Sequence, residues 1–127
     1  MKQLSLKENY LFSKAYSKGK RAITPSVVVY VLRDLHAGLL KKAHPQKIVQ
    51  NRLGLTVTKK MGGAVERSRI KRRLRAAYAE VGKQCEVKKG YLVVLVARTA
   101  TKDISFETLC KNMKDAFKKV GLVQAEA

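Results

Sequence analysis

The sequence predicts a single α+β domain, an α/β sandwich whose elements follow the order α-β-β-β-α-β-α. The chain has 127 residues, the length of one compact domain, so we treat residues 1–127 as a single unit. Apolar residues make up 46% of the chain, which is enough for hydrophobic burial to offset chain entropy. Segments with helical spacing are also interspersed with segments rich in β-branched residues.

The first half predicts one helix followed by strands. Residues 8–18 carry apolar side chains at helical spacing before Gly19, namely Leu11, Phe12, Ala15 and Tyr16. Residues 21–23 predict a short extended piece. Residues 26–32 predict a strand covered on both faces, with Val27, Val29 and Val31 on one side and Val28 and Tyr30 on the other. Residues 34–49 have no clean period and predict a loop.

The second half predicts a strand, a long helix, a buried strand and a last helix. Residues 52–58 alternate strictly, with Leu53, Leu55 and Val57 inward, and the opposite face of this strand can meet a ligand. Gly62 and Gly63 precede a helix over 64–82 with the core stripe Ile70, Leu74, Ala77, Tyr78 and Val81. Residues 91–97 predict a central strand. A helix over 105–120, capped by Asp103 or Ser105, has the core stripe Phe106, Leu109, Cys110, Met113, Phe117 and Val120.

The charge predicts a polyanionic partner. Lys and Arg number 28 against 9 Asp and Glu, so the net charge is 28 − 9 = +19. Such self-repulsion weakens a compact state unless a polyanion lies nearby, and nucleic acid is the obvious one. A membrane surface is the rival, but no apolar run reaches the roughly 18 residues that span a bilayer. Lys2, Lys7 and Glu8 interrupt the first apolar stretch, so we expect neither signal peptide nor anchor and place the chain in the cytoplasm.

Residues for catalysis and metal binding are sparse. Cys85, Cys110, His36 and His44 stand apart without metal-binding spacing, so no protein-bound metal is predicted. No Ser/His/Asp set, paired-His motif or phosphate-binding loop is recognisable. The sequence therefore predicts no catalytic residue.

The segment from Lys59 to Arg75 holds eight cations and one acid. On a helix Arg69 and Arg72 project together, with Lys71 and Arg75 on one side and Arg73 on the other. Arginine suits phosphate because its planar fork can hold two oxygens. A merely solvated charged face is the alternative, but such faces usually carry compensating acids. We predict a polyanion-binding face.

Three aromatic residues form a second, weaker constellation. Phe12 and Tyr16 are one helical turn apart, and Tyr30 lies on the strand face opposite Val27 and Val29. Aromatic planes beside cations can stack unpaired bases. Ordinary packing of a helix on a sheet explains the same pattern, and periodicity leaves both readings open.

Three stretches resemble the bacterial ribonuclease P protein family. Residues 52–60 (Arg-Leu-Gly-Leu-Thr-Val-Thr-Lys-Lys) and 63–72 (Gly-Ala-Val-Glu-Arg-Ser-Arg-Ile-Lys-Arg) resemble its signature, and residues 12–19 resemble its first helix. The resemblance implies a fold like domain 2 of ribosomal protein S5, with a left-handed βαβ crossover. It implies two partners, ribonuclease P RNA and precursor tRNA, without an obligate protein partner. It also implies that RNA-bound Mg²⁺ performs the hydrolysis that frees the tRNA 5′ end.

The resemblance also assigns site residues by position. Those implied to bind the catalytic RNA are Arg67, Ser68, Arg69, Lys71, Arg72, Arg73 and Arg75. Those implied to line a cleft for the 5′ leader of precursor tRNA are Phe12, Tyr16, Tyr30, Arg52, Lys59 and Lys60. Ser68 stands where the family usually has Asn, and the loop over 35–49 is long for the family. Two other hypotheses stay open: a ribosomal-type RNA-binding protein with the same fold, and a general nucleic-acid compactor.

Overall fold

The computed structural model describes residues 4–6, 8–34 and 51–123. Lys2, Lys7 and both histidines lie outside the described residues, as does the predicted loop over 34–49 apart from Asp34. The predicted order of elements is confirmed, with one additional short strand at the start.

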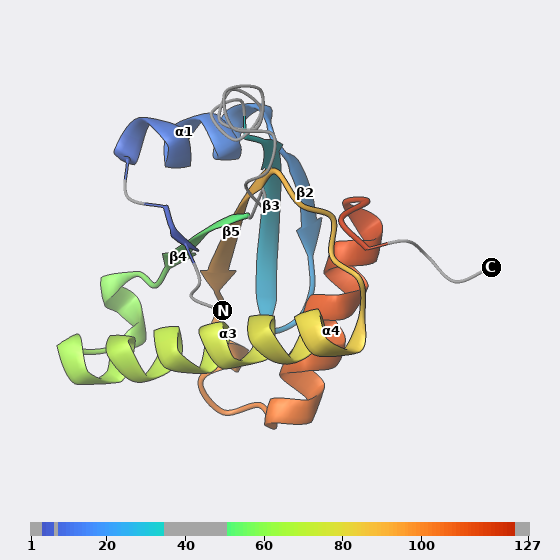
Figure 1. Ribbon diagram of the computed structural model, residues 1–127. Coiled ribbons are helices and arrows are strands. Elements are labelled where there is room, and N and C mark those ends of the chain that lie inside the picture. The colour runs from blue at the N-terminus through green and yellow to red at the C-terminus, as the bar shows by residue number, and fades with distance from the viewer. Residues whose placement is uncertain (1–3, 7, 35–50, 124–127) are drawn as a thin grey trace.

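Within the described residues, five strands form one mixed sheet in the order β1-β4-β5-β3-β2 (Figure 1). Their bounds are β1 Leu4–Ser5, β2 Lys20–Ile23, β3 Val27–Arg33, β4 Arg52–Thr56 and β5 Tyr91–Ala97. β4 and β5 run parallel, whereas β3 pairs antiparallel with β2 and with β5. β5 lies at the centre, where its nearly unbroken apolar run is covered on both faces.

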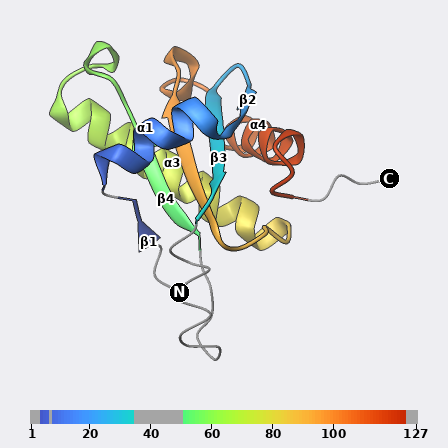
Figure 2. The same cartoon turned by 90° about the horizontal axis from the view of Figure 1, so that it is seen from above.

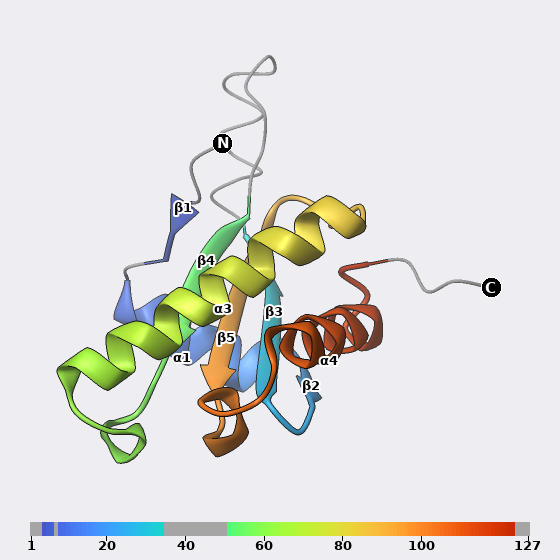
Figure 3. The same cartoon turned by 90° about the horizontal axis from the view of Figure 1, so that it is seen from below.

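Helices cover both faces of the sheet. The helices of the described residues are α1 Asn9–Lys18, α3 Ala64–Gln84 and α4 Phe106–Lys119, and two single turns are η1 Lys59–Met61 and η2 Thr99–Thr101. α1 crosses one face of the sheet (Figure 2). On the other face α3 and α4 pack side by side (Figure 3). The molecule therefore has three layers, with α3 connecting the parallel pair β4 and β5.

Strand alternation divides the core between these layers. The larger cluster lies between the sheet and α3 with α4, and includes Val29, Leu74 and Phe117. The smaller lies beneath α1 and includes Ala15 and Val94. The side chains of β3 and β4 thus point to the two faces as the period-two pattern predicts.

Close backbone approach fixes α1 at its C-terminal end. Gly19 follows the helix and donates its N–H to the carbonyl of Ala15 at 2.9 Å. A Cβ at Gly19 would lie 2.5 Å from that carbonyl oxygen and 2.8 Å from the carbonyl oxygen of Val31. Only glycine lets α1 turn this sharply against β3.

Two details differ from the sequence predictions. β1 pairs in parallel with the start of β4, and its two residues are too few to show a period. The placement of Phe106 in the core is wrong, because this side chain is 40% exposed. Its spacing gives the correct angle around α4, but the first turn of a helix can project beyond the surface that its later turns cover. Ser105 is the cap of α4, accepting the N–H of Thr108 at 3.2 Å.

Candidate nucleic-acid interface

The N-terminal half of α3 presents a cationic surface that its own chain barely neutralises. Its one carboxylate in the first turn, Glu66, lies 3.2 Å from the Lys102 ammonium and 4.0 Å from the Arg69 guanidinium. Among the described residues no ion pair joins Arg72 or Arg75 to an acid. We call this surface the basic face; it consists of Arg67, Ser68, Arg69, Lys71, Arg72 and Arg75.

Arg73 lies on the side of α3 that turns toward α4. Its guanidinium donates a hydrogen bond to the carbonyl of Ile104, in the segment before α4. Arg73 therefore helps fix the α3–α4 layer, and we exclude it from the basic face, although the resemblance assigned it to RNA binding.

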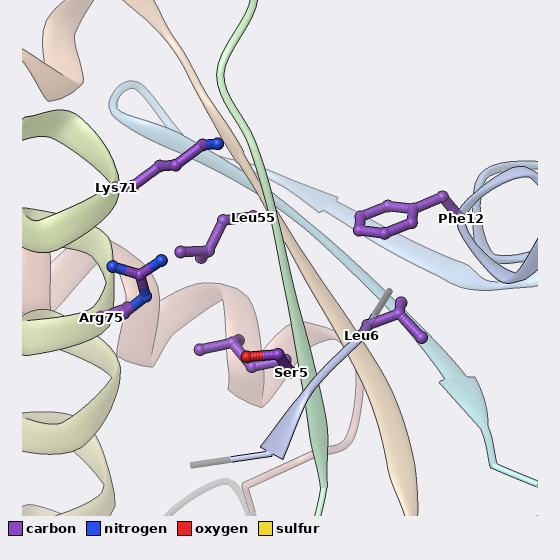
Figure 4. Close-up of a pocket in the computed structure, with 7 residues that line it drawn as sticks. Ser5, Leu6, Phe12, Leu55, Lys71 and Arg75 are labelled. Atoms are coloured by element: carbon purple, nitrogen blue, oxygen red, sulfur yellow. The ribbon is translucent and has the colours of Figure 1, made fainter. Parts of the chain in front are cut away.

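The opposite flank of α3 faces β4 across a hollow of about 170 Å³. Lys71 and Arg75 extend toward β4 from α3, and Phe12 approaches the same strand from α1 on its other side (Figure 4). Leu53 and Leu55 line the hollow between them. The predicted RNA-binding helix and the predicted cleft thus meet at β4.

The aromatic residues form a connected group between α1 and the sheet. The Tyr16 ring meets the Tyr30 ring edge to face with centroids 4.9 Å apart, and the Phe12 ring lies 6.4 Å from Tyr16. The Tyr16 hydroxyl hydrogen-bonds the Thr56 hydroxyl at 2.6 Å. Tyr16 is nevertheless 41% exposed, so part of its ring can meet a base.

Phe12 packs directly on the sheet at Gly54. A Cβ at Gly54 would lie 2.6 Å from Cε1 of that ring, closer than any ordinary contact. Both interpretations of the aromatic residues therefore hold in part. Phe12 is half-buried and packs on the sheet, whereas Tyr16 keeps part of its surface exposed for contact with a ligand. The sequence signal for this contact is a lone glycine inside a strand, which marks close approach of another group.

The Arg52 guanidinium is paired with two carboxylates of its own chain. Its Nε and Nη2 donate to the two Asp34 oxygens at 2.8 and 3.0 Å, and its Nη1 donates to Glu8 at 3.3 Å. The hydrogen bond to Asp34 raises the pKa of Arg52 above its ordinary value, against the effect of burial. Its side chain is 17% exposed. We read Arg52 as a clamp that ties the start of α1 and the end of β3 to β4.

Lys59 and Lys60 are exposed on η1, the turn between β4 and α3. They extend the positive surface from the basic face toward the strand that contacts Phe12 and Tyr16. Sequence reasoning missed Gly54, Thr56 and Asp34, whose roles come from partners distant in the chain.

Within residues 4–6, 8–34 and 51–123, no group of three or more His, Cys, Asp or Glu side chains could hold a metal ion. In the same part of the chain, every helix is too short or too polar to cross a membrane.

Known proteins match the chain over nearly its whole length. Residues 1–121 match the protein family described as Ribonuclease P. The ribonuclease P protein component of Bacillus pumilus (strain SAFR-032) is 33% identical over 125 residues, covering 98% of this chain and 94% of that protein. The component from Clostridioides difficile (strain 630) is 30% identical over 117 residues, covering 92% and 91%.

Solved structures agree with the fold. The RNase P protein of Staphylococcus aureus superposes with a TM-score of 0.72 at 26% identity, covering 95% of this chain and 98% of that one. The RNase P protein from Thermotoga maritima gives a TM-score of 0.66 at 20% identity, covers 100% of both chains and supports the fold alone.

Proposed function

The chain belongs to the ribonuclease P protein family, and we propose that, as the protein component of this tRNA-processing ribonuclease, it binds the enzyme's RNA and the 5′ leader of precursor tRNA. The basic face supports the first contact. The aromatic residues Phe12, Tyr16 and Tyr30 of the predicted leader cleft, which we call the aromatic cleft, support the second. The observation that carries the proposal is the density of uncompensated arginines on α3, where Glu66 is the one acid of the first turn.

The basic face fits structured RNA for a chemical reason. Guanidinium groups hold phosphate oxygens in pairs and are weakly hydrated, so their desolvation against a folded RNA is less costly than that of ammonium groups. Exposed Arg69, Arg72 and Arg75 stand on a rigid helix, so binding orders their side chains without an additional cost for ordering the backbone.

The cleft fits a single strand. Tyr16 and Tyr30 offer ring surface, and Lys59 and Lys60 offer point charges for phosphates near Thr56. Stacking and charge of this kind follow a strand without reading its sequence. In this proposal Phe12 and Arg52 act as positioning residues, because Phe12 packs on Gly54 and Arg52 is paired.

The hydrolysis itself we assign to the RNA of the holoenzyme, with Mg²⁺ held mainly by that RNA. The sequence predicts no catalytic residue, and in this proposal the protein contributes substrate affinity and positive charge. We place the protein in the cytoplasm, where precursor tRNA of a bacterial cell is available.

One reconstitution tests the proposal. The full chain is mixed with a bacterial ribonuclease P RNA at low Mg²⁺, and cleavage of precursor tRNA is measured with and without protein. We expect clear stimulation, and its complete absence would refute the proposal. A ribosomal-type protein would instead prefer ribosomal RNA, and a general compactor would bind duplex DNA equally well.

Two variants separate the two contacts. Arg72→Ala should weaken binding of the enzyme's RNA and lower the salt slope of that binding by about 1. Phe12→Ala should weaken affinity for the leader and leave assembly nearly intact. Lys111→Ala, an exposed cation on α4, is the matched control and should change neither.

A further inference from the structure

A second basic hollow lies at the other end of the molecule. Its volume is about 340 Å³, and its rim carries four cations, Lys18, Lys20, Arg33 and Lys88. Its floor is apolar and includes Val31, Tyr91 and Leu122. We call it the α4 basin because its floor includes the residues that follow α4. No residue of the basic face or of the aromatic cleft lines it.

Sheet register turns the side chains of Lys20, Val31 and Arg33 toward the face opposite the aromatic cleft, whereas Lys18 and Leu32 line the basin from the side of α1. Lys20 is two residues from Ala22, whose side chain is buried against α3 and α4, so both point to that face. Lys20 pairs with Val31 across β2 and β3, and Arg33 pairs with Tyr91 across β3 and β5. The basin therefore lies where the two faces of the sheet meet, and its lining residues differ from those of both surfaces described above.

Within the part of the chain that the structure describes, the four cations are not paired with acids. None of them forms an ion pair with a carboxylate among the described residues, and no lining residue is acidic. Converging like charges repel one another, and the repulsion is relieved when an anion binds between them. A hollow with an uncompensated rim is thus electrostatically prepared for an anion.

The basin walls are held in place without a ligand. Asn51 donates to the Lys88 carbonyl at 2.8 Å and accepts the Tyr91 N–H at 2.9 Å, and the Lys88 N–H donates to the Leu122 carbonyl at 2.8 Å. Gly121, with φ +78°, ends α4 in the left-handed conformation and turns Leu122 back toward the floor. A ligand therefore meets walls whose backbone is already ordered, and binding orders only the long side chains of the rim.

The charged rim and the apolar floor of the basin together favour a ligand that has both an anionic group and an apolar group. An inorganic anion would use the rim and leave the floor unoccupied, whereas a hydrophobic ligand would leave four charges unsatisfied. The volume lies at the lower end of the range for small-ligand pockets, which is about 300–1,000 Å³. A nucleotide combines a phosphate with a flat ring, and Tyr91 supplies an aromatic neighbour for that ring.

We propose that the α4 basin binds one nucleotide, with its phosphate on Lys18, Lys20, Arg33 and Lys88 and its base over Tyr91 and the aliphatic floor. The nucleotide can belong to an RNA strand or be free in solution. The inference rests on the proposed function only in taking RNA as the polymer that supplies it.

The experiment compares two charge-matched double variants of the full chain. K20Q/K88Q removes two rim charges, and K111Q/K114Q removes two charges on α4 that do not line the basin. Affinity for a ten-residue oligouridylate is measured against salt. Because the basin holds one phosphate and each phosphate contact on a single strand contributes about 0.7 to the salt slope, the basin pair should lower the slope by about 0.7 and the affinity by about tenfold. The control pair should change affinity less than twofold.

A second readout identifies the source of the nucleotide. Amide NMR signals of Tyr91 and Gly121 are followed while the oligouridylate, AMP or inorganic phosphate is added, each separately, to the unmodified chain. Shifts with the oligonucleotide alone indicate a strand-bound nucleotide, and shifts with AMP as well indicate that free nucleotide also binds; both support the proposal. Equal shifts with inorganic phosphate and AMP would overturn it, as would equal losses from both double variants.

Circular dichroism of each variant checks that folding is retained, and Y91L supplies an independent test of the floor. This variant should weaken AMP and oligonucleotide binding and leave phosphate unchanged. If the basin pair behaves like the control while the chain still stimulates precursor-tRNA cleavage, the inference fails and the proposed function stands. If stimulation is absent, the proposed function fails by itself.

Discussion

Gly54→Ala tests whether the Phe12 ring is positioned by the sheet. The new Cβ would lie 2.6 and 2.7 Å from two ring carbons and 3.2 Å from a Leu6 methyl carbon. Carbon atoms in good contact are about 3.5–4.0 Å apart, so the ring must move by about 1 Å. Overpacking of this kind costs about 1–3 kcal/mol. Because Phe12 is only half-buried, its ring can swing outward, and we expect a cost of about 1–1.5 kcal/mol, at the lower end of that range.

Urea denaturation of four proteins measures the effect: the unmodified chain, Gly54→Ala, Phe12→Ala and the double variant. With the ring removed, the Gly54→Ala substitution should cost almost nothing, so the coupling free energy should be about 1 kcal/mol. The displaced ring should also weaken leader binding in the Gly54→Ala holoenzyme. Gly82→Ala is the matched control, because nothing lies near a Cβ there and alanine should stabilise α3 by about 0.5–1 kcal/mol. A coupling below about 0.3 kcal/mol would refute the reasoning.

Three further predictions concern other contacts. Arg52→Gln removes the bidentate partner of the Asp34 carboxylate, whose side chain is 3% exposed. The free energy of unfolding, measured by urea denaturation, should fall by about 3 kcal/mol. A loss below about 1 kcal/mol would contradict the role of Arg52 as a clamp. Gly19→Ala brings a Cβ within 2.8 Å of two carbonyl oxygens and should cost about 2 kcal/mol or more by calorimetry; an unchanged midpoint would show that α1 can shift freely. Burial raises the pKa of the Tyr78 hydroxyl, so its neutral form stabilises the fold below about pH 10, where the unfolded phenol ionises, and that stability is lost as pH rises further. Tyr78→Phe should therefore lose less stability than the unmodified chain between about pH 9 and pH 11, and parallel curves would exclude this cause.

Local patterns predicted most of the architecture because each depends on near neighbours. Strict alternation in residues 52–58 placed Leu53 and Leu55 toward α3, and the 3.6-residue stripe of α3 identified Ile70 and Leu74 as core. The unbroken apolar run of β5 indicated its central position. The left-handed sense of the β4-α3-β5 crossover came from family resemblance and stays a prediction.

The contacts that local patterns could not predict join residues far apart in sequence. Arg52 looks like a free cation in an alternating strand, yet its partners are 18 and 44 residues away. Phe12 meets Gly54 through packing that depends on the angle of α1 over the sheet. Phe106 was wrongly predicted to lie in the core for a different reason. Helical spacing specifies the angle of a side chain around the helix axis, but it does not specify how far the sheet extends beneath the helix.

The register of β4 connects these observations to function. Leu53 and Leu55 face α3, whereas Gly54 and Thr56 face Phe12 and Tyr16, so a slip of one residue would exchange the two sets. Pairing with β1 and β5 and the Arg52 clamp hold the strand against that slip. The proposed RNA contacts lie on both sides of this strand. A change that loosens β4 should therefore impair both contacts together, whereas a change confined to α1 or α3 should impair only one.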